Sequence, residues 1–429
     1  MLIKSKINIS YFPKINRISI NNYPNMKKIV LSFLLGLPIL GYSQSFQVNL
    51  QGQKQTAMGG AGTGLALDEA AVFFNPGAVS FLKKNGVQAG ISPLYLKTAF
   101  RENGSNITEY NKDKIATPVM GYAVFGSPAN RLRFGIGIYT PFGGAMHWKE
   151  DWTGKFTVTS LDLQAIYIQP TLSLKITDNI GIGGGLVYSL GKVDLRRAIP
   201  ITKPNGEIST AKLKGDAKDF GWNAGIYVQT VSGVSIGVTH RSQITAKVKG
   251  GDAIFDVPDA LRATMPTKFD AELPLPATTS IGLGFYPSDK TTIAVDVNWV
   301  HWNKYKELAF DYDNNARIPD TKSPRNYHDA AAFRVGIQNQ TTNRLALRAG
   351  IAYAMTPVGK GYVTPEVPDA DRLLLSAGLG FKASERFLID LSFLYENVKA
   401  RNETNIETGL SGEFKTAAYI PGISFSYKW

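Results

Sequence analysis

The sequence predicts an all-β protein, a transmembrane antiparallel β-barrel of 14 strands with an N-terminal hatch, or plug, inside its lumen. Three observations predict this fold. Apolar and polar residues alternate with period 2 along many segments, which is typical of strands with two different faces. Short and long connections alternate between these segments. Charged residues make up 19% of the chain, below the roughly 25% that is usual for soluble domains.

The composition excludes several classes of protein. The 429-residue chain has no cysteine, which excludes disulfide scaffolds, cysteine-ligated metals, thiol catalysis and a lipid anchor on an N-terminal cysteine. The net charge of +13 includes six basic residues and no acid within residues 1–43, and without them 41 basic and 34 acidic residues leave +7. The remaining basic residues form no run, so we expect no nucleic-acid partner.

Residues 1–43 predict an N-terminal extension followed by a signal peptide over residues 26–43. Met26, Lys27 and Lys28 precede an apolar run, Ile29 to Leu40, and small residues follow it. This order is that of a secretory signal, and the run is shorter than the roughly 20 residues that a membrane-spanning helix needs. We expect cleavage after Ser43.

Residues 44–85 predict the hatch. They contain a glycine-rich run, residues 59–64, followed by the segment Phe73, Phe74, Asn75, Pro76 and Gly77. Small residues allow close backbone packing inside a lumen. The run lacks the Lys-Ser/Thr ending of a phosphate-binding loop, and the apolar Phe73–Phe74 pair argues against a solvated tail.

Residues 86–429 predict the barrel. The final strand shows the alternation best, with Tyr419, Ile423, Phe425 and Tyr427 on one face and small or polar residues on the other. The expected strands are 86–99, 115–126, 131–140, 161–177, 179–192, 216–230, 234–248, 277–286, 291–303, 329–339, 344–354, 372–381, 386–398 and 415–429.

The connection lengths distinguish a membrane barrel from a soluble sandwich. Long loops are expected over 100–114, 141–160, 193–215, 249–276, 304–328, 355–371 and 399–414, and short turns join the other strand pairs. Short turns on one side and long loops on the other are typical of barrels in the outer membrane of Gram-negative bacteria. Closure is required, because lipid offers no hydrogen-bond partner to an open sheet edge.

The last residue, Trp429, ends an alternating strand. A terminal aromatic residue in this position resembles the signal that the outer-membrane barrel assembly machinery recognises. We therefore expect that machinery to be a partner.

Several segments resemble the FadL-type (FadL/TodX) outer-membrane transporters of long-chain fatty acids and other hydrocarbons. The matching segments occur in family order over residues 44–429 and are specific in combination. One departure is Gly77, where the family usually has Ala. The segments are residues 71–77, Tyr139-Thr140-Pro141-Phe142-Gly143, Trp148 with residues 151–156, residues 273–285, residues 296–302, residues 326–330, residues 356–358 and residues 364–372.

The resemblance implies uptake of hydrophobic molecules, most of all long-chain fatty acids. Ligand would be captured among extracellular loops, bound in the lumen and released through a gap beside a kinked third strand into the outer-membrane lipid. The family's members usually act alone, so we expect a monomer. Glycine weakens a strand, and Gly135 and Gly137 in the third strand are the expected position of this lateral opening.

Two loops supply candidate ligand-binding residues. Pro258 begins a segment that favours a short helix, with Leu261 and Met265 four residues apart on one face. These two residues and Phe255 either capture ligand or pack onto a neighbouring loop. Phe142, Met146 and Trp148 are similar candidates on the loop that follows the third strand, although Trp148 also suits a membrane-interface position.

We expect no catalytic residue, cofactor or metal site. The four histidines lie far apart in the sequence, without the short spacings of metal sites. A general diffusion porin, or a structural barrel such as an adhesin, is the alternative function. A porin would have an open lumen without a plug.

Overall fold

The computed structural model describes residues 45–127, 129–313 and 318–429. All of them belong to one compact unit, Gly41–Trp429. The expected N-terminal extension and signal peptide, residues 1–43, lie outside the described residues.

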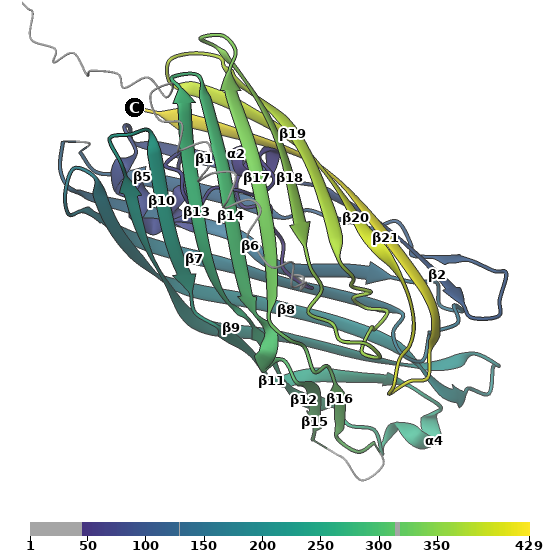
Figure 1. Cartoon of the computed structure of the whole chain (residues 1–429). Helices are drawn as coiled ribbons and strands as arrows, with labels where there is room; N and C mark the ends of the chain where they lie inside the picture. The colour runs from purple at the N-terminus through teal and green to yellow at the C-terminus, as the bar shows by residue number, and fades with distance from the viewer. Residues whose placement is uncertain (1–44, 128, 314–317) are drawn as a thin grey trace, which may run out of the picture. The chain divides into compact units, whose positions relative to one another are not determined.

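Strands form most of the described chain and alternate in direction with their neighbours (Figure 1). In chain order they are β1 (Gly86–Ile91), β2 (Leu94–Glu102), β3 (Glu109–Tyr110), β4 (Ile115–Ala116), β5 (Val119–Phe125), β6 (Leu132–His147), β7 (Ser160–Lys175), β8 (Ile180–Thr202), β9 (Ile208–Gln229), β10 (Val234–Arg241), β11 (Ile244–Asp256), β12 (Lys268–Leu275), β13 (Ala277–Ser288), β14 (Thr291–His301), β15 (Glu307–Tyr312), β16 (Thr321–Pro324), β17 (Ala330–Gln340), β18 (Leu345–Ala354), β19 (Arg372–Lys382), β20 (Phe387–Thr404) and β21 (Ser411–Lys428).

The sheet closes on itself into a barrel of 14 strands, as the sequence predicts. β1 pairs antiparallel with β5 on one edge and with β21 on the other. Several wall positions are made of two consecutive segments, among them β1 with β2, β10 with β11, and β12 with β13. Closure leaves no lipid-exposed edge. A hydrogen bond from Trp429 N to Asn85 O at 3.1 Å joins the end of the last strand to the start of the first.

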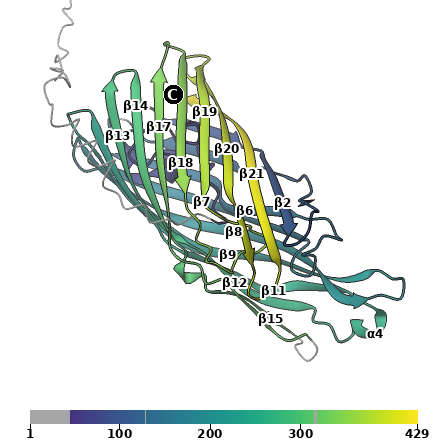
Figure 2. The same cartoon turned by 45° about the vertical axis from the view of Figure 1, so that its right-hand side comes forward.

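The two ends of the barrel differ as predicted, with short turns at one end and long loops at the other. Several strands run further toward the loop end than expected, and β8, β9, β11 and β12 extend to the end where α4 (Asp259–Arg262) lies (Figure 2). The expected loop over residues 193–215 was wrong, because most of it continues the β8–β9 hairpin. Register pairs such as Leu195 with Leu213 keep that hairpin hydrogen-bonded.

The barrel's outer surface is apolar over its membrane-spanning part. On β21, Tyr419, Phe425 and Tyr427 are exposed, whereas Ser424 and Ser426 on the opposite face are buried. This polarity is the reverse of a soluble protein's and suits a lipid-facing wall around a polar interior. No helix in the described ranges is long and apolar enough to cross a membrane.

The segment of residues 45–85, which precedes β1, lies inside the ring of strands (Figure 1). It forms two short α-helices and one 3₁₀ helix, and another 3₁₀ helix follows β14. Nearly every residue from 50 to 65 is buried. The helices are α2 (Gln53–Ala57), α3 (Ala71–Phe74), η2 (Pro76–Phe81) and η3 (Trp302–Lys304).

Candidate functional site

Asn75 is the central polar contact of the hatch, which in the described part of the chain comprises residues 45–85. Its side chain is fully buried, and Nδ2 donates to Thr63 O and to Ile226 O of β9, both at 3.0 Å. Its Oδ1 accepts from Gly77 N at 3.0 Å. Asn75 thereby caps η2, where Pro76 occupies the first helical position, the arrangement that favours Asn followed by Pro. One side chain joins two hatch segments to the wall.

The neighbouring hatch residues pack tightly against the wall. A Cβ added at Gly77 would lie 2.8 Å from Gly181 O and Gly225 O, closer than real Cβ contacts. This explains why glycine occupies the position in this chain. Phe74 is buried, and the Phe73 ring lies 5.0 Å from that of Tyr139, edge to face.

Arg241 of β10 adds a buried positive charge beside Phe73. Its guanidinium carbon lies 4.8 Å above the Phe73 ring, a cation–π arrangement. Its Nη1 donates to Tyr139 Oη at 2.7 Å and to Gln169 Oε1 at 2.9 Å. These contacts connect the hatch to three wall strands.

The glycine-rich run, residues 59–64, binds to two charged wall residues. The Asp296 carboxylate accepts from Gly62 N and Thr63 N, both at 2.8 Å. Arg334 Nη1 donates to Gly60 O at 3.0 Å. Such charge-assisted hydrogen bonds are stronger than neutral ones, so they hold an otherwise flexible run.

The inner wall has glycines where the hatch approaches it. A methyl group at Gly237 would overlap Thr63 O, and one at Gly350 would overlap the backbone of Gly59. Gly135 and Gly137 of β6 belong to this set, because an added Cβ at Gly135 would lie 2.6 Å from Val72. The pairing of β6 with β5 and β7 is continuous through both glycines. They give space to the hatch, and the wall is closed beside them.

Buried ion pairs add to the anchoring of the hatch. Lys54 Nζ lies 3.5 Å from Asp68 and 3.9 Å from Asp390 of β20, which also pairs with Arg348 at 2.8 Å. Removing one partner of such a group leaves an uncompensated buried charge. The polar helix α2 is therefore stable inside the barrel because the lumen supplies its partners.

The wall's sidedness inverts toward the loop end. In the membrane-spanning part, Gln169 and Ser173 of β7 face inward, while Leu172 faces lipid. Further along, Leu161 and Leu163 face inward and Asp162 faces outward. Across β8 and β9 the inward rows read Leu163–Val193–Gly215 and Leu161–Leu195–Leu213, and the outward row reads Asp162–Asp194–Lys214. Above the membrane, the barrel thus has an apolar interior and a charged exterior.

An apolar cavity of about 220 Å³ lies within this extension. Its lining combines inward side chains of several strands, and Leu213 and Phe269 are among the most buried. Arg325 also lines it, paired with Glu366 at 3.0 Å. Burial raises the pKa of the nearby Tyr305, although Arg325 lowers it. The apolar lining includes Leu161, Leu163, Val193, Leu195, Leu213, Phe269, Leu273 and Phe310.

β6 loses its partner on one side beyond Tyr139. Its pairing with β5 stops at Tyr139, and its register with β7 shifts between Tyr139 and Phe142, a β-bulge that bends the strand. The freed edge instead binds the start of the described chain. Val48 N donates to Pro141 O at 2.9 Å, and Gly143 N donates to Phe46 O at 3.0 Å. Residues 46–48 cover the break in the wall from inside.

A larger cavity of about 810 Å³ is lined from both faces of the sheet at this break. Leu50 of the hatch and inward-facing apolar wall residues form one part, the latter including Leu94, Leu96, Leu374, Leu394 and Ile420. Outward-facing polar residues form another, among them Gln164, Lys192 and Asp216. Thr117, Pro118 and Thr140, which flank the break, also line it. The cavity thus reaches from the lumen to the outer face.

The structure separates the six loop residues that the sequence suggested as ligand contacts. Met146 faces inward and lines the larger cavity. Phe142 is buried, its ring 6.4 Å from that of Trp302. Trp148 stacks on Trp152 at 4.3 Å and donates from Nε1 to Pro365 O at 3.1 Å.

The other three loop candidates lie near α4. Met265 is buried, whereas Phe255 and Leu261 are half-buried. None of these three lines either cavity.

Sequence reasoning missed most of the cavity lining. Val193, Leu195 and Leu213 alternate with charged residues and fell in an expected loop. This alternation was the available signal for a strand. The residues that alternate with the apolar ones are charged here, whereas the outer faces of the lipid-facing strands are apolar. Within the described ranges, no group of three or more acidic or histidine side chains could hold a metal ion.

A closed, lipid-facing barrel that is blocked by its own N-terminal segment is a plugged outer-membrane channel. A family model described as "Outer membrane protein transport protein (OMPP1/FadL/TodX)" matches residues 40–429, so the chain belongs to this family of channels for hydrophobic substrates. It is a transporter of the bacterial outer membrane and not an enzyme.

Relatives of known name agree with this membership. The long-chain fatty acid transport protein of Escherichia coli O6:H1 is 23% identical over 425 residues, covering 90% of this chain and 94% of the relative. The 47 kDa outer membrane protein of Pasteurella multocida is 26% identical over 396 residues, covering 86% and 90%.

Solved structures share the fold. A Pseudomonas aeruginosa FadL homologue superposes with a TM-score of 0.79 at 19% identity, covering 90% of this chain and 99% of that one. The Pseudomonas putida toluene transporter TodX superposes with a TM-score of 0.68 at 15% identity, covering 88% and 98%.

Proposed function

We propose that the protein takes up long-chain fatty acids from outside the cell. The acyl chain enters the apolar interior of the extended strands, moves to the larger cavity and leaves sideways at the break beside β6 into the outer membrane. The observation that carries this proposal is the inverted sidedness of β7–β9, whose inward row Leu161–Leu195–Leu213 offers an apolar surface above the membrane.

Burial of the chain provides the driving force. Each CH₂ transferred from water to an apolar site contributes about 0.8 kcal/mol. A sideways exit spares the chain a second exposure to water. Residues 46–48 cover the break with two backbone hydrogen bonds, so this segment must move for the chain to leave. In this proposal residues 44–85 are the gate and residues 86–429 are the channel.

A general diffusion porin is the less suitable alternative. Small solutes need an open aqueous lumen, but the buried hatch residues 50–65 occupy the barrel's interior. Outer-membrane lipid is the acceptor in this proposal, and recognition of Trp429 by the assembly machinery stays a prediction.

Equilibrium binding tests the proposal. Purified protein in mild detergent is expected to bind radiolabelled hexadecanoate, and Leu163→Glu, which places a charge in both cavities' lining, is expected to abolish most of the binding. Stronger competition by toluene than by unlabelled hexadecanoate would favour aromatic hydrocarbons instead. No binding of either compound would contradict the proposal.

A further inference from the structure

The break in the wall lies at the edge of the apolar band. The last outward-facing row that is apolar on all four strands β6–β9 lies before the bulge, and Phe220 in it is 74% exposed. The row that follows, Ile166–Leu190–Lys218, is apolar on β7 and β8 and charged on β9. On the other side of the break, Tyr95 pairs with Tyr419, and both are exposed on the outer face. Tyrosines of this kind occupy membrane–water interfaces. The first of these two rows consists of Ile138, Ile168, Tyr188 and Phe220. The opening therefore meets the level of lipid head groups.

The outer lining of the larger cavity is polar at this level. The row at the break reads Gly143–Gln164–Lys192–Asp216 across β6–β9, and the next row contains Asp162, Asp194 and Lys214. A molecule with its tail in the apolar part of the cavity would present its other end to these rows.

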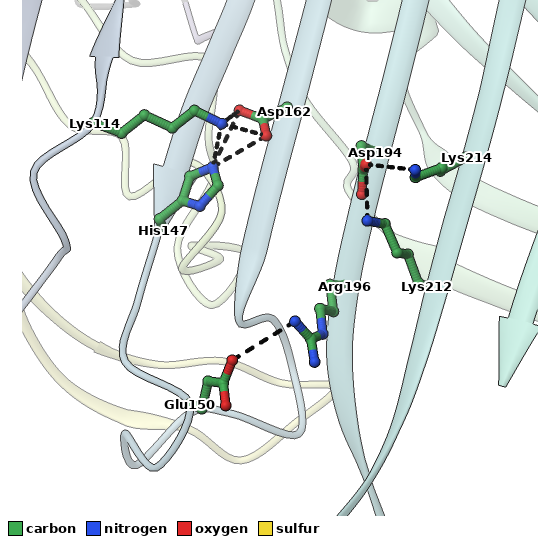
Figure 3. Close-up of polar contacts among 8 residues, drawn as sticks. All are labelled: Lys114, His147, Glu150, Asp162, Asp194, Arg196, Lys212 and Lys214. Atoms are coloured by element: carbon green, nitrogen blue, oxygen red, sulfur yellow. Dashed lines mark hydrogen bonds and ion pairs between the residues drawn. The ribbon is translucent and has the colours of Figure 1, made fainter. Parts of the chain in front are cut away.

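Most of the charges in these rows are already neutralised. Figure 3 shows Lys114 and His147 at Asp162, and Lys212 and Lys214 at Asp194. Lys114 Nζ lies 2.6 Å from Asp162. Each of these lysines would have to give up a carboxylate before it could bind another anion.

Lys192 differs from the other basic residues of the cavity. It is exposed and lines both cavities. Arg372, Lys114 and Lys214 have acidic partners, whereas Lys192 forms no ion pair with any described residue. Its cross-strand neighbours are Gln164 and Asp216. Asp216 is the acidic side chain on the adjacent position and forms no ion pair with a described residue either.

We propose that Lys192 binds the anionic head group of an acyl amphiphile at the outer mouth of the break, while the tail lies in the apolar part of the cavity. This deepens the proposed function, on which it rests, and assigns the cargo a carboxylate. An ammonium group that gains a carboxylate forms a charge-assisted hydrogen bond. Gln164 supplies an additional donor, and the Asp216 carboxylate on the adjacent position weakens the site by repelling the anion.

Binding of two amphiphiles of equal chain length tests the inference. Hexadecanoate and hexadecan-1-ol are titrated into the full chain in mild detergent. Lys192→Gln is expected to weaken hexadecanoate binding roughly tenfold and to leave hexadecan-1-ol binding unchanged. Asp216→Asn is expected to strengthen hexadecanoate binding. Lys218→Gln is the matched control, because Lys218 faces outward on β9 and lines neither cavity.

The outcomes separate the inference from the function beneath it. Equal hexadecanoate affinity of wild type and Lys192→Gln, or equal losses for both amphiphiles, would overturn the inference alone. Failure of the wild type to bind either amphiphile would overturn the proposed function as well. If Lys192→Gln instead reduced only the lipopolysaccharide that copurifies, measured by mass spectrometry, the anion would be a lipid phosphate and the inference would be wrong.

Discussion

Replacing Asn75 tests how the hatch is held in the barrel. Asn75→Ala removes hydrogen bonds to Thr63 O, Ile226 O and Gly77 N, each 3.0 Å long; the bond to Ile226 O is part-buried and the other two are buried. A hydrogen bond of this kind contributes about 1 kcal/mol net, so the variant loses about 3 kcal/mol of stability of the folded hatch, of which about 1 kcal/mol is the bond to Ile226 O of the wall. Since about 1.4 kcal/mol changes an equilibrium tenfold, the population with an unfolded, released hatch rises about 100-fold.

Hydrogen exchange followed by mass spectrometry measures this change. The amides of residues 62–77 are expected to lose protection in Asn75→Ala, while those of β17–β21 keep theirs, because local opening leaves the barrel folded. Asn103→Ala is the control, since Asn103 also forms side-chain hydrogen bonds but is exposed. Unchanged protection of the hatch amides would refute the reasoning.

Three further changes are expected to act on separate parts of the channel. Gly237→Val should displace the hatch and raise single-channel conductance. Gly121→Val, where an added Cβ has space, should leave the conductance unchanged. Equal conductance of the two variants would count against close packing of the hatch on the wall. Val48→Pro removes the amide that binds the carbonyl of β6 and should speed release of hexadecanoate to vesicles relative to Val48→Ala. Leu213→Asn should weaken hexadecanoate binding about tenfold by the lost apolar contact, while Lys212→Gln on the opposite face of the strand should leave binding unchanged. A larger loss for Lys212→Gln than for Leu213→Asn would place the ligand on the outer face of the barrel.

Much of the barrel could be predicted because lipid imposes a simple pattern. On β21, Tyr419, Phe425 and Tyr427 must face hydrocarbon, and the small side chains between them must face the hatch. Short turns and long loops then set the strand order. The extension of β8 and β9 was missed because its outward residues, such as Asp194 and Lys214, are charged like those of a loop.

The position of the wall break could not be predicted from glycine alone. Positions 135 and 137 are glycine because Val72 of the hatch packs against both. This contact joins segments that are far apart in the sequence. The break depends instead on where β5 begins and on the bulge after Tyr139, which only the pairing of three strands determines. The cavity lining was missed for a related reason. Leu213 can be placed on the inner face only when β9 is known to extend through this position.

Transfer of cargo into a lipid bilayer tests the central claim most directly. Proteoliposomes with the full chain are given radiolabelled hexadecanoate and, in parallel, a swelling assay with small sugars. The account predicts protein-dependent entry of hexadecanoate into the bilayer without swelling. Free passage of sugars with no acceleration of hexadecanoate entry would contradict it.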